Sequence, residues 1–69
     1  MEKLMISLAA ARVNARMTQA EVAKAIKISK NTLINWEKGE TEPSFASLNM
    51  LANLYGVPLD NIILPFKST

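Results

Sequence analysis

The segment from Thr18 to Gly39, TQAEVAKAIKISKNTLINWEKG, contains two short helical patterns separated by only a few residues. Thr18 followed by Glu21 three positions later has the spacing of a capping box, which begins a helix. Apolar residues then recur at helical spacing in two groups, Val22, Ala23 and Ile26, followed by Leu33 and Trp36. Ser29, between the groups, is the natural N-cap of the second helix. Two helices joined by so short a link must cross at a steep angle.

The size and composition of the chain limit what else it can be. Its 69 residues predict a single domain over 1–69, near the lower size at which one hydrophobic core suffices. No apolar run approaches the roughly eighteen residues needed to span a bilayer, so we expect no membrane association. Cysteine and histidine are absent, and there is no conspicuous carboxylate pair or phosphate-binding glycine loop. We therefore expect no cofactor, no metal site and no enzymatic activity.

The complete pattern predicts an all-α fold with five helices and no strand. The expected helices are Leu4–Ala15, Gln19–Ile26, Lys30–Lys38, Phe45–Tyr55 and Leu59–Leu64. Ser44 should cap the fourth helix, and Gly39 and Gly56 should end the third and fourth. The chain should leave the second helix in a left-handed conformation that favours glycine, but Lys27 stands there. We expect strain of about 1 kcal/mol at that residue.

The third expected helix has a polar face opposite Leu33 that suits the major groove of DNA. The candidate base-reading residues are Lys30, Asn31, Thr32 and Asn35. Asparagine can donate to and accept from the N6 and N7 edge of adenine, lysine can donate to guanine, and a threonine methyl can contact the thymine methyl. The alternative is that these are ordinary solvated side chains.

Candidate phosphate contacts surround this face. They are Gln19, Lys27, Trp36 and Lys38. Gln19 opens the second helix, where free amides and the helix dipole favour a phosphate. The ring of Trp36 should pack on the core, while its indole N–H can reach outward. Net charge is only +2, but the segment from Arg12 to Lys38 contains six basic residues and only two acidic ones. Lysines that merely lie on solvated helix surfaces would give a similar pattern.

Glu37 falls on the inward side of the third helix, where an unpaired carboxylate would be costly. Arg12 in the first helix is the best candidate for its cation. We expect a bidentate bridge that pins the first helix to the third.

Four segments, TQAEVAKAI, ISKNTLINWEKG, EPSFASLNMLANLYGV and PLDNII, together resemble the Cro and phage-repressor (XRE) helix-turn-helix proteins over nearly the whole chain. The resemblance implies a compact five-helix bundle of the phage-repressor DNA-binding domain type, with the helix-turn-helix in helices two and three. It places the phosphate-binding glutamine at Gln19, base-reading positions at Lys30, Asn31 and Asn35, and the interhelical pair at Arg12 and Glu37. The chain departs from the family pattern in two places. Glycines are common at the positions of Arg16 and Lys27, and the loop that holds Glu40 and Glu42 is often basic in the family.

These observations predict a sequence-specific transcriptional regulator of double-stranded DNA, a prophage or bacterial repressor in the cytosol and associated with the nucleoid. The rival is an antitoxin or regulatory subunit whose main partner is another protein; the short polar groups of the third helix favour DNA. The resemblance also implies a homodimer on a two-fold operator. Its candidate contacts are Ile62, Ile63, Leu64 and Phe66, although these residues can equally close the protein's own core.

Overall fold

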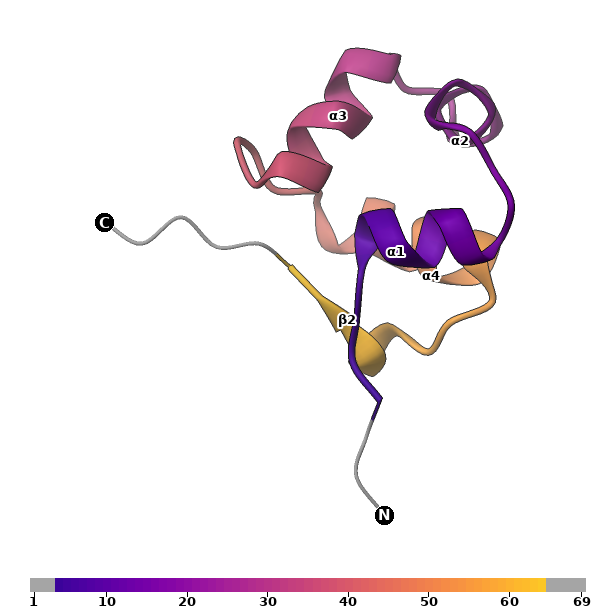
Figure 1. Cartoon of the computed structure of the whole chain (residues 1–69). Coiled ribbons are helices and arrows are strands. Elements are labelled where there is room, and N and C mark those ends of the chain that lie inside the picture. Colours follow the sequence, from indigo (N-terminus) through magenta and orange to yellow (C-terminus); the bar gives the residue numbers. More distant parts are fainter. Residues whose placement is uncertain (1–3, 65–69) are drawn as a thin grey trace.

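The computed structural model describes residues 4–64. In chain order the elements are β1 (Ile6–Ser7), α1 (Leu8–Asn14), α2 (Gln19–Ile26), α3 (Lys30–Lys38), α4 (Phe45–Tyr55), the 3-10 turn η1 (Leu59–Asn61) and β2 (Ile62–Ile63). Figure 1 shows α2 and α3 on one side of the molecule, while α1 and α4 lie across the other. Among the described helices none can cross a bilayer, since the longest has 11 residues.

The expected helical class is correct, but the expected count of five helices is wrong. The first helix begins at Leu8 rather than Leu4, because Ser7 caps it by accepting from the Ala10 amide at 3.1 Å. The expected fifth helix, Leu59–Leu64, is a single 3-10 turn followed by an extended segment.

The expectation that no strand forms is also wrong. Strands β1 and β2 pair in parallel, with Ile6 opposite Ile62 and Ser7 opposite Ile63. β-branched isoleucines suit extended backbone, so pairing between the two ends of the described chain outweighs the short local helical patterns.

The three central helices have the expected bounds because local capping signals set them. Each N-cap side chain accepts from the backbone amide three residues later, in the pairs Thr18 with Glu21, Ser29 with Thr32, and Ser44 with Ser47. The capping box of α2 is complete, since the Thr18 amide also donates to Glu21 Oε1 at 2.8 Å. Gly39 and Gly56 end α3 and α4 in the left-handed conformation, with φ of 82° and 70°.

Two basic residues with left-handed backbone flank α2. Lys27 at its C-terminal end has φ of 61°, as expected from the sequence, and Arg16 before its N-terminal end has φ of 59°. Both side chains are exposed. A residue with a Cβ is strained by about 1 kcal/mol in this conformation, so the turns around α2 are less stable than glycine would make them.

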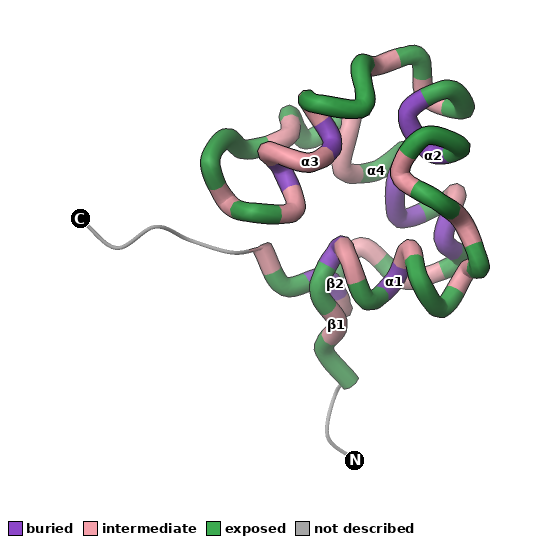
Figure 2. The backbone as a smooth tube through the Cα atoms, turned by 45° about the horizontal axis from the view of Figure 1, so that its top comes forward, coloured by how far each residue is buried: buried purple, intermediate pink, exposed green. Residues whose placement is uncertain are grey.

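The core joins the four α-helices of residues 4–64. Its largest fully buried side chains come one from each helix: Leu8, Val22, Leu33 and Leu51. Figure 2 shows the buried segments, in purple, on α1, α2, α3 and α4 and at β2. Because α3 contributes both Leu33 and Trp36 to this core, its rotation about its own axis is fixed, and so is the face it exposes.

Candidate nucleic-acid interface

The outward face of α3 carries the four expected base-reading residues. Lys30 and Asn31 are exposed, while Thr32 and Asn35 are half-buried. Asn31 and Asn35 are four residues apart, so they lie on the same face of the helix. The hydroxyl of Thr32 lies 2.8 Å from the Ser29 hydroxyl at the N-cap. Because the hydroxyl already has this partner, the methyl group is the part of the Thr32 side chain that remains for a contact with another molecule.

The inward face of α3 is apolar at Leu33 and Trp36. Only 8% of Trp36 is exposed, and the residue belongs to the core cluster. Trp36 therefore acts first as a packing residue, and a phosphate contact through its indole N–H would have to use the small exposed remainder.

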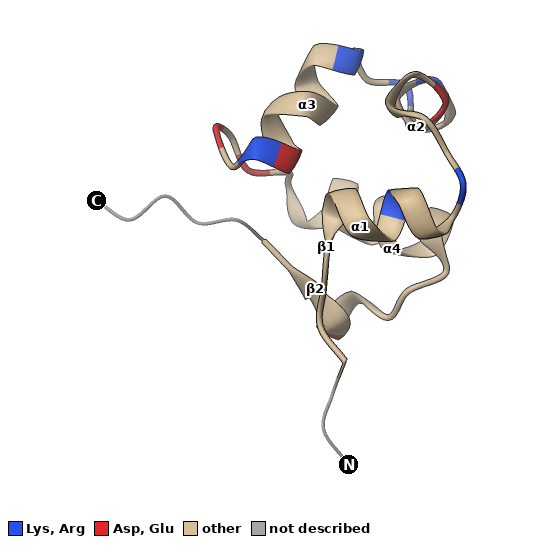
Figure 3. Cartoon of the chain, in the orientation of Figure 1, with Lys and Arg blue, Asp and Glu red and all other residues tan. Residues whose placement is uncertain are grey.

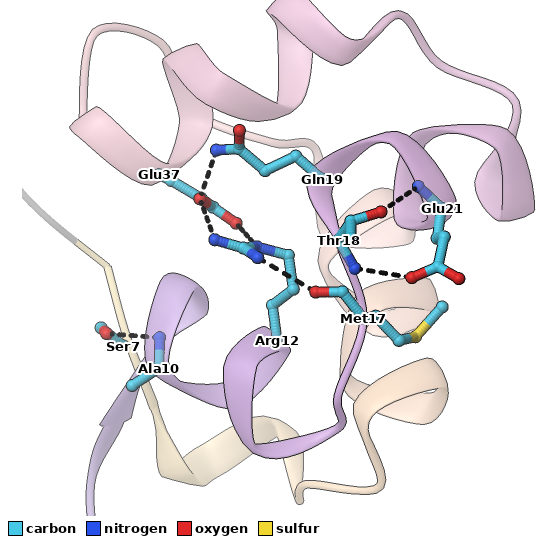
Figure 4. A network of polar contacts seen from close by, with 8 residues as sticks. All are labelled: Ser7, Ala10, Arg12, Met17, Thr18, Gln19, Glu21 and Glu37. Carbon is cyan, nitrogen blue, oxygen red and sulfur yellow. Dashed lines mark hydrogen bonds and ion pairs between the residues drawn. The ribbon is translucent and has the colours of Figure 1, made fainter.

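A polar network joins α1, α2 and α3 beside this face (Figure 4). Arg12 Nε donates to Glu37 Oε2 at 2.8 Å, and Arg12 Nη2 donates to Glu37 Oε1 at 3.3 Å. Arg12 Nη1 donates to the carbonyl of Met17 at 3.0 Å. The Arg12 and Glu37 side chains are only 16% and 7% exposed. This bidentate geometry connects the first helix to the third, as expected from the inward position of Glu37.

Gln19 belongs to the same network, which the sequence did not indicate. Its Nε2 donates to Glu37 Oε1 at 2.9 Å, so Glu37 accepts hydrogen bonds from both α1 and α2. The sequence identified Gln19 only as the first residue of α2 and a phosphate candidate. No local signal could place it against Glu37, because the contact depends on the crossing of α2 and α3.

The network is close to a buried tyrosine that sequence reasoning also missed. Tyr55 of α4 is 8% exposed, and its Oη has no hydrogen-bond partner among residues 4–64. Burial, with a smaller contribution from the Glu37 carboxylate, raises the pKa of Tyr55 to about 12, while Arg12 opposes the shift. The hydrogen bond with Glu37 raises the pKa of Arg12 above its usual value, despite partial burial.

Charges are distributed unevenly around the helix pair (Figure 3). Lys30 and Lys38 lie at the two ends of α3 and Lys27 at the end of α2, and all three are exposed. The loop after α3 carries the exposed residues Glu40 and Glu42. Positive potential is therefore associated with the helices, and negative potential with the loop that follows them.

The residues expected to form a dimer contact are divided by the structure. Ile62 is 9% exposed and belongs to the core, whereas Ile63 is 46% exposed. Leu64 is half-buried against the core, and Phe66 lies outside the described residues. Leu4 and Met5, which precede β1, are exposed at 79% and 44%. The surface around the two paired strands is thus partly closed core and partly exposed apolar side chains.

Comparison with known proteins gives a consistent result. The Helix-turn-helix family matches residues 8–62. The cryptic phage CTXphi transcriptional repressor RstR of Vibrio cholerae is 38% identical over 52 residues, which cover 75% of this chain and 47% of RstR. The HTH-type transcriptional regulator ImmR of Bacillus subtilis is 38% identical over 53 residues, covering 77% of this chain and 42% of ImmR.

A third relative, the uncharacterized HTH-type transcriptional regulator MJ0272 of Methanocaldococcus jannaschii, is 33% identical over 48 residues, covering 70% of this chain and 73% of the relative. No solved structure matches the chain. The chain spans less than half the length of RstR and of ImmR. The family match runs from the start of α1 to the start of β2 and includes the four helices. The chain therefore belongs to the helix-turn-helix family of the Cro and phage-repressor (XRE) type.

Proposed function

We propose that this chain is a sequence-specific DNA-binding transcriptional regulator, a repressor that reads the major groove of double-stranded DNA with α3. The observation that carries the proposal is the division of α3 into two faces. Leu33 and Trp36 fix its inner face in the core, while Lys30 and Asn31 are exposed and Asn35 is partly exposed on the outside. A rigid helix with short polar donors and acceptors matches the edges of base pairs.

The relatives support the regulatory role, since RstR is a transcriptional repressor and ImmR and MJ0272 are transcriptional regulators. In the proposed complex, Asn31 and Asn35 bind adenine edges, Lys30 donates to guanine, and the Thr32 methyl contacts thymine. Gln19, Lys27 and Lys38 contact phosphates at the borders of α3, and these contacts set the register of the protein on the duplex.

We further propose that the protein acts in the bacterial cytosol as a homodimer on a two-fold operator. The exposed apolar side chains of Leu4 and Met5 before β1 and of Ile63 in β2 support the homodimer, because a second copy can cover them. Two half-sites would then lie about one helical turn apart on the DNA.

Selection of binding sites from random duplexes, followed by titration at several salt concentrations, tests this function. Affinity should fall steeply with salt, and the selected sites should be palindromic. Asn35→Ala should reduce discrimination at one base position by about 1–3 kcal/mol. Asn49→Ala, which makes the same chemical change at an exposed position of α4, serves as the control and should leave affinity unchanged. Equal affinity for all duplexes would contradict the proposed function.

A further inference from the structure

The side-chain amide of Gln19 is held in one orientation. Its Nε2 lies 2.9 Å from Glu37 Oε1, and an ionised carboxylate can only accept hydrogen bonds. Rotating the amide by half a turn would place its oxygen against the carboxylate, which is repulsive. One N–H of Gln19 is therefore committed to Glu37, and a second N–H remains for another acceptor.

Arg12 is the group that keeps Glu37 in place. Nε, Nη1 and Nη2 of Arg12 each donate to an acceptor within the protein, two of them to Glu37 and one to Met17. Because its side chain is only 16% exposed, Arg12 has little surface to offer a phosphate. Its positive charge instead compensates the carboxylate that lies against Gln19.

Without Arg12, the Glu37 charge would stand uncompensated beside the N-terminal end of α2. That end is where free backbone amides and the helix dipole favour an anion. A bare carboxylate at this position would repel a phosphate and would also lose the contacts that fix its own position. The state of the Arg12 and Glu37 pair should therefore decide how well Gln19 can bind.

Building on the proposed DNA-binding function, we propose that Arg12 is a positioning residue for phosphate binding. Through Glu37 it fixes the amide of Gln19 so that the remaining N–H meets a DNA phosphate, and it neutralises the carboxylate behind that contact. Arg12 thus contributes to DNA affinity without touching the DNA.

A set of variants tests this proposal, with dissociation constants measured on a selected duplex and melting curves recorded for each protein. Arg12→Met should weaken binding by more than about tenfold. The double variant Arg12→Met/Glu37→Met removes both charges and should recover much of that loss, because no carboxylate is left to repel the phosphate. If Arg12 bound the phosphate directly, the double variant would bind as weakly as Arg12→Met, and the proposal would be overturned.

The contribution of Gln19 provides a second comparison, which does not require the single Arg12 variant to fold. Gln19→Met should weaken binding about tenfold in the unmodified chain, but no more than about threefold in the Arg12→Met/Glu37→Met background. Equal losses in both backgrounds would overturn the proposal. The slope of log affinity against log salt should be the same with and without Arg12; a slope shallower by about one would indicate a direct phosphate contact and would also overturn it.

A measurement on the unmodified chain covers the case in which the double variant does not fold. In proton–nitrogen correlation spectra, DNA should strongly shift one of the two Gln19 side-chain amide protons and leave the other, bound to Glu37, nearly unchanged. No shift of either proton would overturn the proposal. If sequence-dependent binding and the Asn35→Ala effect persist, the proposed function survives such a result; if no duplex is preferred, the function itself fails.

Discussion

The helix pair α2–α3 and the strand pair β1–β2 are held in different ways. Three capping side chains set the starts of α2, α3 and α4, and a network of charged and amide groups attaches α2 and α3 to α1. The strands have only two residues each, and Ile63 in β2 is 46% exposed. Directional polar contacts therefore fix the positions of α2 and α3. The strand pair closes the core with few such contacts.

The largest expected effect is the loss of a core residue beneath the recognition helix. Leu33→Ala should lower the free energy of unfolding by about 3–5 kcal/mol, because Leu33 is fully buried and its truncation leaves a cavity. Ile63→Ala in β2 is the matched change in the other region and should cost less than about 1 kcal/mol. Urea denaturation measures both. Similar losses would contradict the contrast between the two regions.

Breaking the polar network should have the next largest effect. Arg12→Ala leaves the carboxylate of Glu37 nearly buried without its cation, and since the pair is slightly solvated we expect a loss of about 2–3 kcal/mol. Thermal melting should show the loss clearly. An unchanged melting temperature would mean that the bridge does not hold α1 to α3.

Tyr55 should make stability depend on alkaline pH. Its folded pKa of about 12 lies above the usual value of 10.0, so the folded state keeps the proton after the unfolded chain has released it. The contribution of the protonated Tyr55 to the free energy of unfolding is therefore fully present below pH 10 and should fall as the pH rises toward 12. Tyr55→Phe should remove this Tyr55-dependent fall. Urea unfolding at several pH values measures the effect, and an identical alkaline loss in the variant would contradict the assignment.

At neutral pH, the same Tyr55→Phe variant should be as stable as the original chain, or more stable by up to about 1 kcal/mol. It removes a buried hydroxyl that has no partner among the described residues. A clear destabilisation would show that the hydroxyl is hydrogen-bonded in solution.

The smallest effect is expected at the turn between α2 and α3. Lys27→Gly relieves the left-handed strain but increases the freedom of the unfolded chain, so stability should be unchanged or rise by up to about 1 kcal/mol. DNA affinity should fall if the lysine contacts a phosphate. Arg16→Gly relieves the same strain at the other end of α2 and serves as the matched control. Marked destabilisation by Lys27→Gly would show that the lysine side chain supports the turn.

Much of the fold could be predicted because its signals are local. The bounds of α2, α3 and α4 follow from Thr18, Ser29 and Ser44, whose side chains act on amides three residues away. The left-handed conformation of Lys27 follows from the short link between two helical patterns. The ends of the fold could not be predicted in this way, because the short apolar runs there are compatible with either helix or strand.

The candidate site shows the same division. The polar face of α3 and its buried face follow from spacing along one helix, which is why Asn31 and Leu33 could be assigned to opposite sides. The cation for Glu37 could be inferred because a buried carboxylate needs one. The contact between Gln19 and Glu37 could not, since the sequence leaves a glutamine at a helix start equally compatible with water or a phosphate.

By itself, the sequence determined where the central helices begin and end and which side of each is apolar, because caps and periodicity act within one or two turns. Only the tertiary structure decided that β1 and β2 pair as strands, that Tyr55 is buried near the charged pair, and that Gln19 donates to Glu37. Those features depend on how separate helices cross and which distant segments meet. Such contacts have no fixed spacing along the chain, and they contribute to stability only once the core has formed.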